Sequence, residues 1–382
     1  MFGVTHYVPI LRWKRAEKVA LRNLQPHDRS VVTPLIEFIP PNFKPGRDGS
    51  EANPALVLER QAGEIAKNWG LTPVFVDLLH VEEDIPPIEG ALHALDYFSA
   101  QALRQNVYLI PVTGLMRSPG HRDAIKRAAS SGRGVCFRLE VSQILQPDFS
   151  RHLLREAGAV GDHGAVDLIL DYGVFGESAP TMEDVISLIP DVGSWRSLTW
   201  AAGAFPQNLQ EYTPGRHTRD RADWQAYKSQ VSSSELMRLP AFGDYTVQYG
   251  AYKEPPEHSN PSASIRYALE DEWVIMRGEG LFNDDAPGHE QYCANAILLS
   301  ESDEFYGANF SYGDSYIHDV AQGIKDHGNP ETWIRAGINH HITVTCRQVA
   351  GLASSLGNDG RRRANARIRH APLARSISTR GA

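Results

Sequence analysis

Charged residues stand at the ends of several short apolar runs in the first half of the sequence. They are Lys14, Glu37, Asp77, Arg138, Glu140 and Asp171. Arginine and lysine can hold an anionic substrate, while carboxylates can serve as general acid, general base or metal ligand. This mixture predicts a site for an anionic or phosphate-containing small molecule, with a hydrolase or a lyase as the reaction class.

Candidate roles follow from residue type and position. We assign as catalytic Glu37, Asp77, Arg138, Glu140, Asp171, His340 and His341. We assign as substrate-binding Arg12, Lys14, Thr113, Asp244 and Tyr245. In this scheme the anion is held by Arg12, Lys14 and Arg138, while Glu140 and Asp171 transfer protons.

A divalent cation such as magnesium is compatible with the four carboxylates, because magnesium prefers oxygen ligands. No His-rich spacing such as H-E-x-x-H accompanies them, so zinc is not predicted. A structural interpretation stays open beside the functional one, in which Arg138 pairs with Glu140 and Lys14 pairs with Glu37 in an ion-pair layer. Desolvation cancels much of what a buried ion pair contributes, and this favours the functional interpretation.

Two adjacent histidines, His340 and His341, form a second candidate site, with Asp314 and His318 upstream. Adjacent side chains on a helix point about 100° apart, so both histidines cannot easily bind one metal ion. One of them could carry protons at the same site. A histidine that hydrogen-bonds within a helical cap is the structural alternative, and the sequence does not decide between the two.

The elements that would position these residues alternate regularly. The β-rich runs are Tyr7–Arg12, Val31–Phe38, Pro73–Leu79, Val107–Thr113, Val135–Val141, Val166–Asp171, Ser197–Ala202 and Leu239–Val247. Amphipathic helical runs lie between them, at Ala16–Leu24, Ala55–Asn68, Ile88–Gln105, His121–Ser130, Phe149–Ala157, Met182–Ile189 and Arg221–Val231. The strand starts are 24 to 42 residues apart, which is the spacing that parallel βα units need.

This order predicts an α/β fold of the (β/α)8 TIM-barrel type, in which sites lie at the C-terminal ends of the strands. Residues of equal parity share one face of a strand, so Arg12 lies on the face of Val8 and Ile10, and Arg138 lies on the face of Glu140. The charged strand ends are therefore expected to meet at one mouth.

Three prolines argue against a closed barrel. Pro9, Pro34 and Pro111 fall inside predicted strands, and each lacks the N–H that a strand ladder uses. Bulges or later strand starts would accommodate them. An open doubly wound sheet is the alternative fold, but no G-x-G-x-x-G or G-x-x-x-x-G-K-[ST] follows any strand, which favours the barrel.

After Val247 the pattern changes. Ser264–Leu269 and Trp273–Arg277 flank an acidic turn and predict a β-hairpin. The helices expected after it are His289–Leu299, Ser315–Gly323 and Trp333–Ala353. We therefore predict a barrel over 1–255, a hairpin plus helical C-terminal extension packed on it over 256–358, and a disordered basic tail over 359–382.

Charge is unevenly distributed. The net charge is −8, yet the segment from Arg361 to Ala382 holds seven arginines and no acidic residue, which leaves −15 for the rest. Nucleic-acid binding needs clustered lysine and arginine, so it is expected only at the tail, if anywhere. A small anionic substrate or a protein partner is expected instead, and no oligomeric state is predicted.

Composition is that of a globular protein with a core, at 42% apolar and 22% charged residues. No apolar run reaches the ~18 residues of a membrane span. The N-terminus lacks a basic segment followed by an apolar one, so no signal peptide is expected. Three cysteines far apart suit a reducing compartment. A cytoplasmic protein is the expectation.

Two patches resemble the phage-type beta protein family. They are Tyr7-Val8-Pro9-Ile10-Leu11-Arg12-Trp13-Lys14 with Thr33-Pro34-Leu35-Ile36-Glu37, and Gly328-Asn329-Pro330 to Trp333 with Asn339-His340-His341. The resemblance extends over nearly the whole chain and implies a bacterial or phage protein, carried with mobile or anti-phage defence genes. It marks as family positions Arg12, Lys14, Glu37, Asn339, His340 and His341. It transfers no reaction, so a non-catalytic partner-binding or sensing module on a barrel scaffold stays open beside an enzyme.

Overall fold

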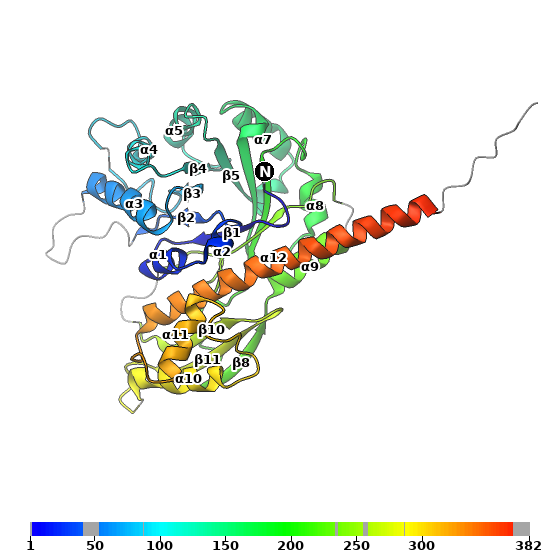
Figure 1. Ribbon diagram of the computed structural model, residues 1–382. Helices are drawn as coiled ribbons and strands as arrows, with labels where there is room; N and C mark the ends of the chain where they lie inside the picture. The colour runs from blue at the N-terminus through cyan, green and yellow to red at the C-terminus, as the bar shows by residue number, and fades with distance from the viewer. Residues whose placement is uncertain are drawn as a thin grey trace, which may run out of the picture.

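Eight parallel strands close into a barrel in the order β1-β2-β3-β4-β5-β6-β7-β9 (Figure 1). The computed structural model describes residues 2–40, 53–86, 88–233, 236–254, 259–285 and 287–369, with side chains described to residue 356. The barrel strands are β1 (Tyr7–Leu11), β2 (Leu35–Glu37), β3 (Val74–Asp77), β4 (Leu109–Thr113), β5 (Val135–Glu140), β6 (Val166–Val174), β7 (Ser197–Gly203) and β9 (Ala241–Asp244). Each overlaps one predicted run, and the predicted TIM-type barrel is confirmed.

Helices connect the strands and surround the barrel. They are α1 (Arg15–Arg22), α2 (Pro26–Arg29), α3 (Pro54–Asn68), α4 (Ala94–Arg104), α5 (Pro119–Ala129), α6 (Val141–Ile144), α7 (Phe149–Gly158), α8 (Met182–Ser187) and α9 (Ala222–Ser233). Several of these helices start at a capping residue. The side chains of Asn53, Ser118 and Thr181 accept hydrogen bonds from backbone N–H groups of the first turn. None of the described helices is long and apolar enough to cross a membrane.

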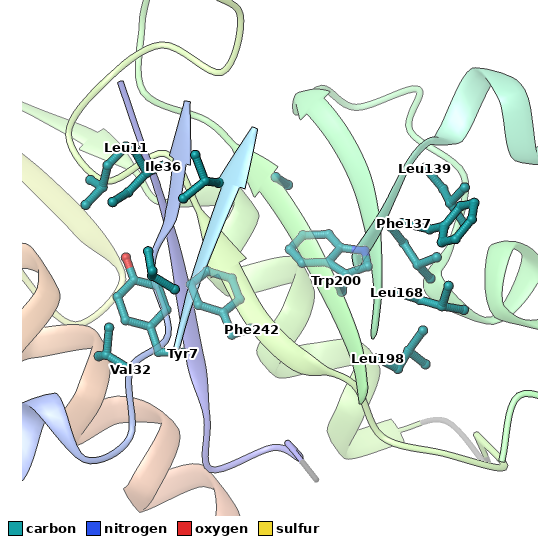
Figure 2. Packing of buried hydrophobic residues seen from close by; sticks show 14 of the residues in the cluster. Tyr7, Leu11, Val32, Ile36, Phe137, Leu139, Leu168, Leu198, Trp200 and Phe242 are labelled. Carbon is teal, nitrogen blue, oxygen red and sulfur yellow. The ribbon is translucent and has the colours of Figure 1, made fainter. Parts of the chain in front are cut away.

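Apolar side chains fill both sides of the barrel wall. The inward-facing set is Val8, Ile10, Leu35, Phe75, Ile110, Val112, Cys136, Ile169, Ala201 and Tyr245. The outward-facing set packs under the helices and includes Tyr7, Leu11, Ile36, Phe137, Leu168, Trp200 and Phe242 (Figure 2). Side chains alternate between the two faces along each strand, so apolar residues of equal parity share one face, as predicted from the sequence.

The three prolines coincide with interruptions in strand pairing. Pro9 and Pro34 lie between the Tyr7–Val32 bridge and the point where β1 and β2 pair regularly, from Ile10 onwards. Pro111 pairs with β3, and the pairing of β4 with β5 begins one residue later. The barrel therefore closes around the positions where a backbone donor is missing.

A second, three-stranded antiparallel sheet of order β10-β11-β8 lies beside the barrel. Its first two strands, β10 (Ser262–Ala268) and β11 (Glu272–Gly280), form the hairpin predicted from the sequence. Its third strand, β8 (Gly215–Asp220), comes from the connection between β7 and α9. This strand was not predicted, because its run Gly215-Arg216-His217-Thr218-Arg219-Asp220 is polar and largely exposed.

The last helix, α12 (Pro330–Arg369), completes the helical layer of the barrel. It follows α10 (Gln291–Ser300) and α11 (Tyr312–Ala321), and it packs against α1 and β1 as well as β10. Figure 1 shows it crossing the barrel flank above α9 and running on beyond the body. β8 comes from the segment predicted to form the barrel but pairs with β11 of the small sheet, while α12 contacts both β1 of the barrel and β10 of the small sheet.

Helix α12 also runs into the region predicted to be a disordered tail. Residues 359–369 are helical, which differs from the prediction, and 370–382 lie outside the described residues. Charge composition suggested disorder there, whereas the backbone continues a helix that begins on the barrel. The helix thus extends well beyond the predicted end at Ala353.

Close packing of α11 on α12 predicts a sensitive position at Gly313. A Cβ there would collide with the backbone carbonyl oxygen of Ala336, so Gly313→Ala is expected to lower the free energy of unfolding by about 1–3 kcal/mol. Urea denaturation would measure this. Gly63→Ala is the control, because a Cβ on this α3 glycine meets open space and should raise stability by up to ~1 kcal/mol. Equal effects of the two substitutions would contradict the prediction.

Candidate functional site

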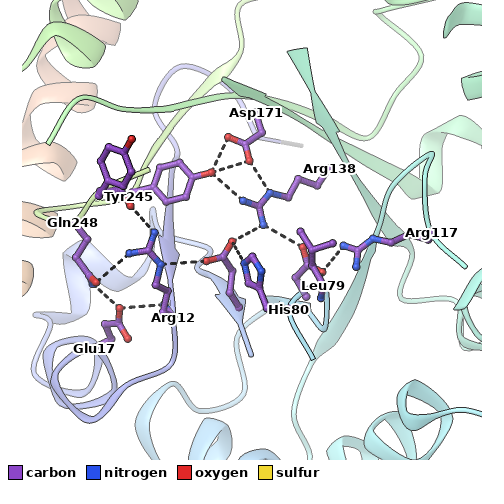
Figure 3. A network of polar contacts seen from close by, with 12 residues as sticks. Arg12, Glu17, Leu79, His80, Arg117, Arg138, Asp171, Tyr245 and Gln248 are labelled. Atoms are coloured by element: carbon purple, nitrogen blue, oxygen red, sulfur yellow. Dashed lines mark hydrogen bonds and ion pairs between the residues drawn. The ribbon is translucent and has the colours of Figure 1, made fainter. Parts of the chain in front are cut away.

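Arg138 lies at the centre of the charged residues at the barrel mouth (Figure 3). Its guanidinium donates to Glu37 at 2.6 Å, to Asp77 at 3.2 Å and to Asp171 at 2.7 Å. It also donates to the Tyr245 hydroxyl at 2.9 Å, and this hydroxyl in turn donates to Asp171 at 2.8 Å. Residues of β2, β3 and β6 and the residue after β9 thus converge on one cation from β5, as the barrel geometry predicts.

Burial and ion pairing set the charges of these acids. Burial alone would raise the pKa of Glu37, but Arg138, with smaller contributions from His80 and Arg12, outweighs it and lowers the pKa to about 2. The pKa of Asp77 is likewise lowered, because Arg117 and Arg138 outweigh the effect of burial. Both groups are therefore ionised at neutral pH and hold arginines in place, which makes them poor proton donors.

Two further arginines extend the network on either side of Arg138. Arg117 donates to Asp77 at 2.5 Å and to Glu82 at 3.4 Å. Arg12 donates to the Tyr249 backbone carbonyl at 2.5 Å, and its Nε lies 3.8 Å from a Glu37 carboxylate oxygen. The mouth therefore holds three arginines, each beside at least one carboxylate.

Backbone strain occurs directly beside two of these side chains. Trp13 and Thr246 adopt positive φ values of 52° and 58°, which non-glycine residues seldom adopt. Each follows a mouth residue, Arg12 and Tyr245 respectively. The chain turns sharply after β1 and β9 at these points, where the two side chains enter the polar network.

Glu140 stands apart from the arginine network although it ends the same strand as Arg138. It is exposed, and its carboxylate accepts a hydrogen bond from the Ser142 hydroxyl at 3.3 Å. A cavity of about 100 Å³ at this end of the barrel is lined by Arg117, Arg138, Glu140 and Asp171, with Leu79, Gly114, Met116 and Gln143. Two cationic side chains and one solvent-facing carboxylate therefore share a small opening at the mouth.

Two predicted substrate-binding residues lie away from this opening. Thr113 is buried and lines a separate small cavity with Phe137 and Ile125, between the barrel wall and α5. Lys14 precedes α1, where its backbone N–H donates to the Glu17 carboxylate at 2.5 Å. Burial lowers the pKa of the Lys14 amine. The structure does not bring either residue to Arg138.

Asp244 faces outward, which corrects its expected place at the mouth. It accepts a hydrogen bond from Tyr7 at 2.5 Å and pairs with His341 of α12 at 2.7 Å. Burial lowers the pKa of His341. The Trp273 indole N–H points at the other ring nitrogen, 3.5 Å away. Tyr7, Asp244 and His341 therefore join the barrel wall to its last helix.

His340 likewise lies within the fold, not over the mouth. Its Nδ1 is 2.8 Å from Asp314 and its Nε2 is 2.8 Å from the Ala268 carbonyl oxygen. Both ring nitrogens of His340 are thus within hydrogen-bonding distance of an oxygen from another part of the fold. His340 and His341 are both fully buried, and the structure thus supports the hydrogen-bonding interpretation of this pair.

Asn339, the residue before these histidines, ties three helices together. Its side-chain amide donates to the Ala20 carbonyl of α1 at 3.0 Å, and its carbonyl oxygen accepts from the Gly313 N–H of α11 at 3.0 Å. Three successive residues of α12 therefore make polar contacts with different elements of the fold. A packing role accounts for all of these contacts.

The carboxylates are arranged around a guanidinium instead of a metal ion. Across the described part of the chain, no group of three or more His, Cys, Asp and Glu side chains is placed to hold a metal. Glu37, Asp77 and Asp171 all direct oxygens at Arg138. These residues do not fit the expected magnesium-type site.

Sequence reasoning missed several members of the network. Arg117, His80 and Glu82 lie in loops after β3 and β4, and Gln248 follows β9. His80 pairs with Glu37 at 3.5 Å, while Gln248 donates to Glu17 at 2.6 Å. The rule that barrel sites are built from strand-to-helix loops was the available signal, but it does not say which loop residue turns inward.

A closed parallel β/α barrel with a polar, arginine-centred C-terminal mouth defines the class of protein. The sequence model of the beta protein family matches residues 7–347. The chain therefore belongs to the beta protein family, and the predicted resemblance is confirmed. A search of curated proteins finds no match to this sequence.

Solved structures share little sequence with the chain. The crystal structure of SacUVDE is 11% identical, with a TM-score of 0.28, over 64% of this chain and 94% of that chain. PbGH5A, a glycoside hydrolase family 5 enzyme from Prevotella bryantii, in complex with a xyloglucan tetradecasaccharide, is 11% identical with a TM-score of 0.32, over 88% of this chain and 99% of that chain. The barrel assignment rests on the strand pairing, because such low scores carry no argument.

Proposed function

We propose that this protein is a barrel enzyme, a hydrolase or a lyase, that acts on an anionic or phosphate-containing small substrate at the mouth. One observation carries the proposal: Arg138, held by three carboxylates, lines the same opening as Arg117 and the solvent-facing Glu140. Fixed cations beside an available carboxylate are the combination that anion binding and proton transfer need. The cytoplasmic location and the link with phage or anti-phage defence are part of this proposal.

The chemistry divides between the two kinds of residue. Arg138 and Arg117 attract the anionic group and hold it in the opening, because their side chains are already oriented by Asp77 and its neighbours. Glu140 takes a proton from a water molecule or from the substrate and returns it to the leaving group. Glu37 and Asp77 stay ionised and position the arginines. A cavity of about 100 Å³ admits the anionic group, while the rest of the substrate would lie outside.

Glu140→Gln tests this assignment directly. General acid–base groups contribute about 10²–10⁴-fold to rate, so the variant is expected to lose at least 100-fold in kcat while retaining ligand binding. The first measurement is a thermal-shift screen of the full chain with phosphate, sugar phosphates and small carboxylates, because a ligand of the native state raises Tm. Turnover of each ligand that binds is then followed for wild type and variant.

Two variants serve as controls for this experiment. Asp123→Asn changes an exposed α5 carboxylate paired with Lys126, and it should leave binding and turnover unchanged. Arg117→Ala should weaken binding of the anion. The enzyme proposal fails if a ligand binds at the mouth but is not turned over, or if Glu140→Gln turns it over at the wild-type rate.

A non-catalytic binding or sensing module is the second candidate, and two observations favour it. Each carboxylate that contacts Arg138 is already paired, and the opening is smaller than the ~300–1,000 Å³ of common ligand sites. Such a module would use the mouth as a rigid plug and a recognition surface. Ligand binding that Arg117→Ala weakens, without turnover in any assay, would support this candidate instead.

A further inference from the structure

A larger cavity, of about 610 Å³, lies on the barrel flank between α9 and α12. The residues that line it do not overlap with those that line the mouth opening. Its volume falls within the range of small-molecule sites. Trp224 and Lys228 of α9 form one side, α12 forms the other, and Tyr306 and Phe310 come from the loop before α11.

One wall of this cavity is a stack of three planar groups. The Arg347 guanidinium lies over the Phe310 ring, 3.9 Å from its centroid. Tyr306 stacks on Phe310 with 4.6 Å between ring centroids and an interplanar angle of 16°. The Arg347 guanidinium, Phe310 and Tyr306 therefore lie next to one another along this wall. A stack of this kind offers both a flat surface and a fixed cation.

Arg347 has its charge available for a ligand. It is exposed, and although its charge acts on the nearby Asp28 carboxylate, no described residue forms a hydrogen bond or an ion pair with its guanidinium. Lys228 across the cavity is paired with Asp271 at 2.5 Å. An oriented but unpaired guanidinium binds phosphate or carboxylate groups well, because its fork of donors matches their oxygens.

Trp224 adds to the aromatic lining of the cavity. The ring is almost fully buried and lines the cavity, yet its indole N–H has no partner among the described residues. Aromatic surface and an exposed cation therefore meet in one cavity.

We propose that this flank cavity binds a planar aromatic anion of the size of a mononucleotide. The acidic group lies on Arg347, and the ring stacks on the aromatic wall beside Tyr306. This site is independent of the activity proposed at the mouth, because the two share no residue. Glu270, which also lines the cavity, accepts hydrogen bonds from an exocyclic amine and so favours amino-substituted rings.

Isothermal titration of the full chain with AMP, GMP, CMP and UMP tests the proposal. At least one nucleotide is expected to bind with submillimolar Kd. Arg347→Ala should weaken that binding about ten-fold or more, because the hydrogen bonds to a charged group are lost. Tyr306→Leu should weaken it through loss of stacking. Ribose 5-phosphate, which lacks the ring, should bind more weakly than the nucleotide.

Matched variants separate this site from the mouth. Arg151→Ala changes an exposed α7 arginine and should not affect nucleotide binding. Nucleotides and ribose 5-phosphate are also titrated into Arg117→Ala, which removes any binding of their phosphate at the mouth. Far-ultraviolet circular dichroism and Tm show whether each variant is folded. The proposal is overturned if no nucleotide binds to Arg117→Ala at millimolar concentration, if ribose 5-phosphate binds to this variant as tightly as the nucleotide, or if Arg347→Ala leaves nucleotide binding unchanged.

Discussion

An Arg138→Ala variant is expected to lose about 3–5 kcal/mol of unfolding free energy, the usual effect of removing one partner from a buried ion pair. Glu37, Asp77 and Asp171 each direct an oxygen at this guanidinium, and all three are buried. Without it, their charges would repel one another in a space with little water. Urea denaturation at pH 7 measures the loss, which is large against the 5–15 kcal/mol of a whole domain.

Two comparisons isolate the cause of that loss. Arg138→Lys keeps the charge but loses the planar fork that reaches three carboxylates, so its effect should lie between wild type and alanine. Arg151→Ala removes an exposed arginine whose i,i+3 partner is also exposed, and it should change stability by less than ~1 kcal/mol. If Arg138→Ala lowered the free energy of unfolding by less than ~1 kcal/mol, solvent and not the arginine would be stabilising the charges of the mouth carboxylates.

The same residue is central to stability and to the proposed function. A buried ion-pair cluster is a weak source of net stability, and an apolar plug would close the barrel equally well. Here the cluster instead leaves Arg138 next to Arg117 and Glu140 at an opening. Burying several charges costs desolvation free energy. That cost is explained if the arginines must keep a fixed orientation for a ligand.

Most residues of the mouth can be predicted from the sequence, because the face on which a strand residue lies depends only on its position along that strand. Parity along each strand places Glu37, Asp77, Arg138 and Asp171 on the inward face, and the parallel order brings their ends together. The same rule separates Asp244 from Tyr245, since adjacent residues point to opposite faces. Assigning both to the mouth overlooked that rule, and Asp244 lies on the outer face with Phe242.

Long-range packing could not be predicted in the same way. The surroundings of His340 and His341 depend on where α12 docks, and about 85 residues separate β9 from the start of that helix. The periodicity of α12 indicates a helix but does not say that it covers the barrel. Arg117 and Arg347 were missed for a related reason, since the partners of a loop or surface arginine come from other elements.

The protein is expected to lose stability in acid, with Glu37 contributing about 3 kcal/mol. Its pKa falls from 4.5 in the unfolded chain to about 2 in the fold, and each unit corresponds to 1.36 kcal/mol. A lowered pKa means that the contribution is complete above pH 4.5 and disappears as the pH falls towards 2. Asp77, Asp244 and Asp314 have lowered pKa values and act in the same direction.

Asp223 acts in the opposite direction. Burial and the nearby Asp244 raise its pKa from 3.8 to about 6, so its contribution is complete below pH 3.8 and is lost as the pH rises through 6. Unfolding free energies measured in urea between pH 2 and 7 separate the two effects. The free energy of unfolding of Glu37→Gln should be lower than that of wild type at pH 7 and approach it near pH 2. For Asp223→Asn it should rise relative to wild type as the pH increases from 3.8 to about 6. Parallel profiles for wild type and Glu37→Gln would mean that the Glu37 carboxylate is not held in its charged form by Arg138.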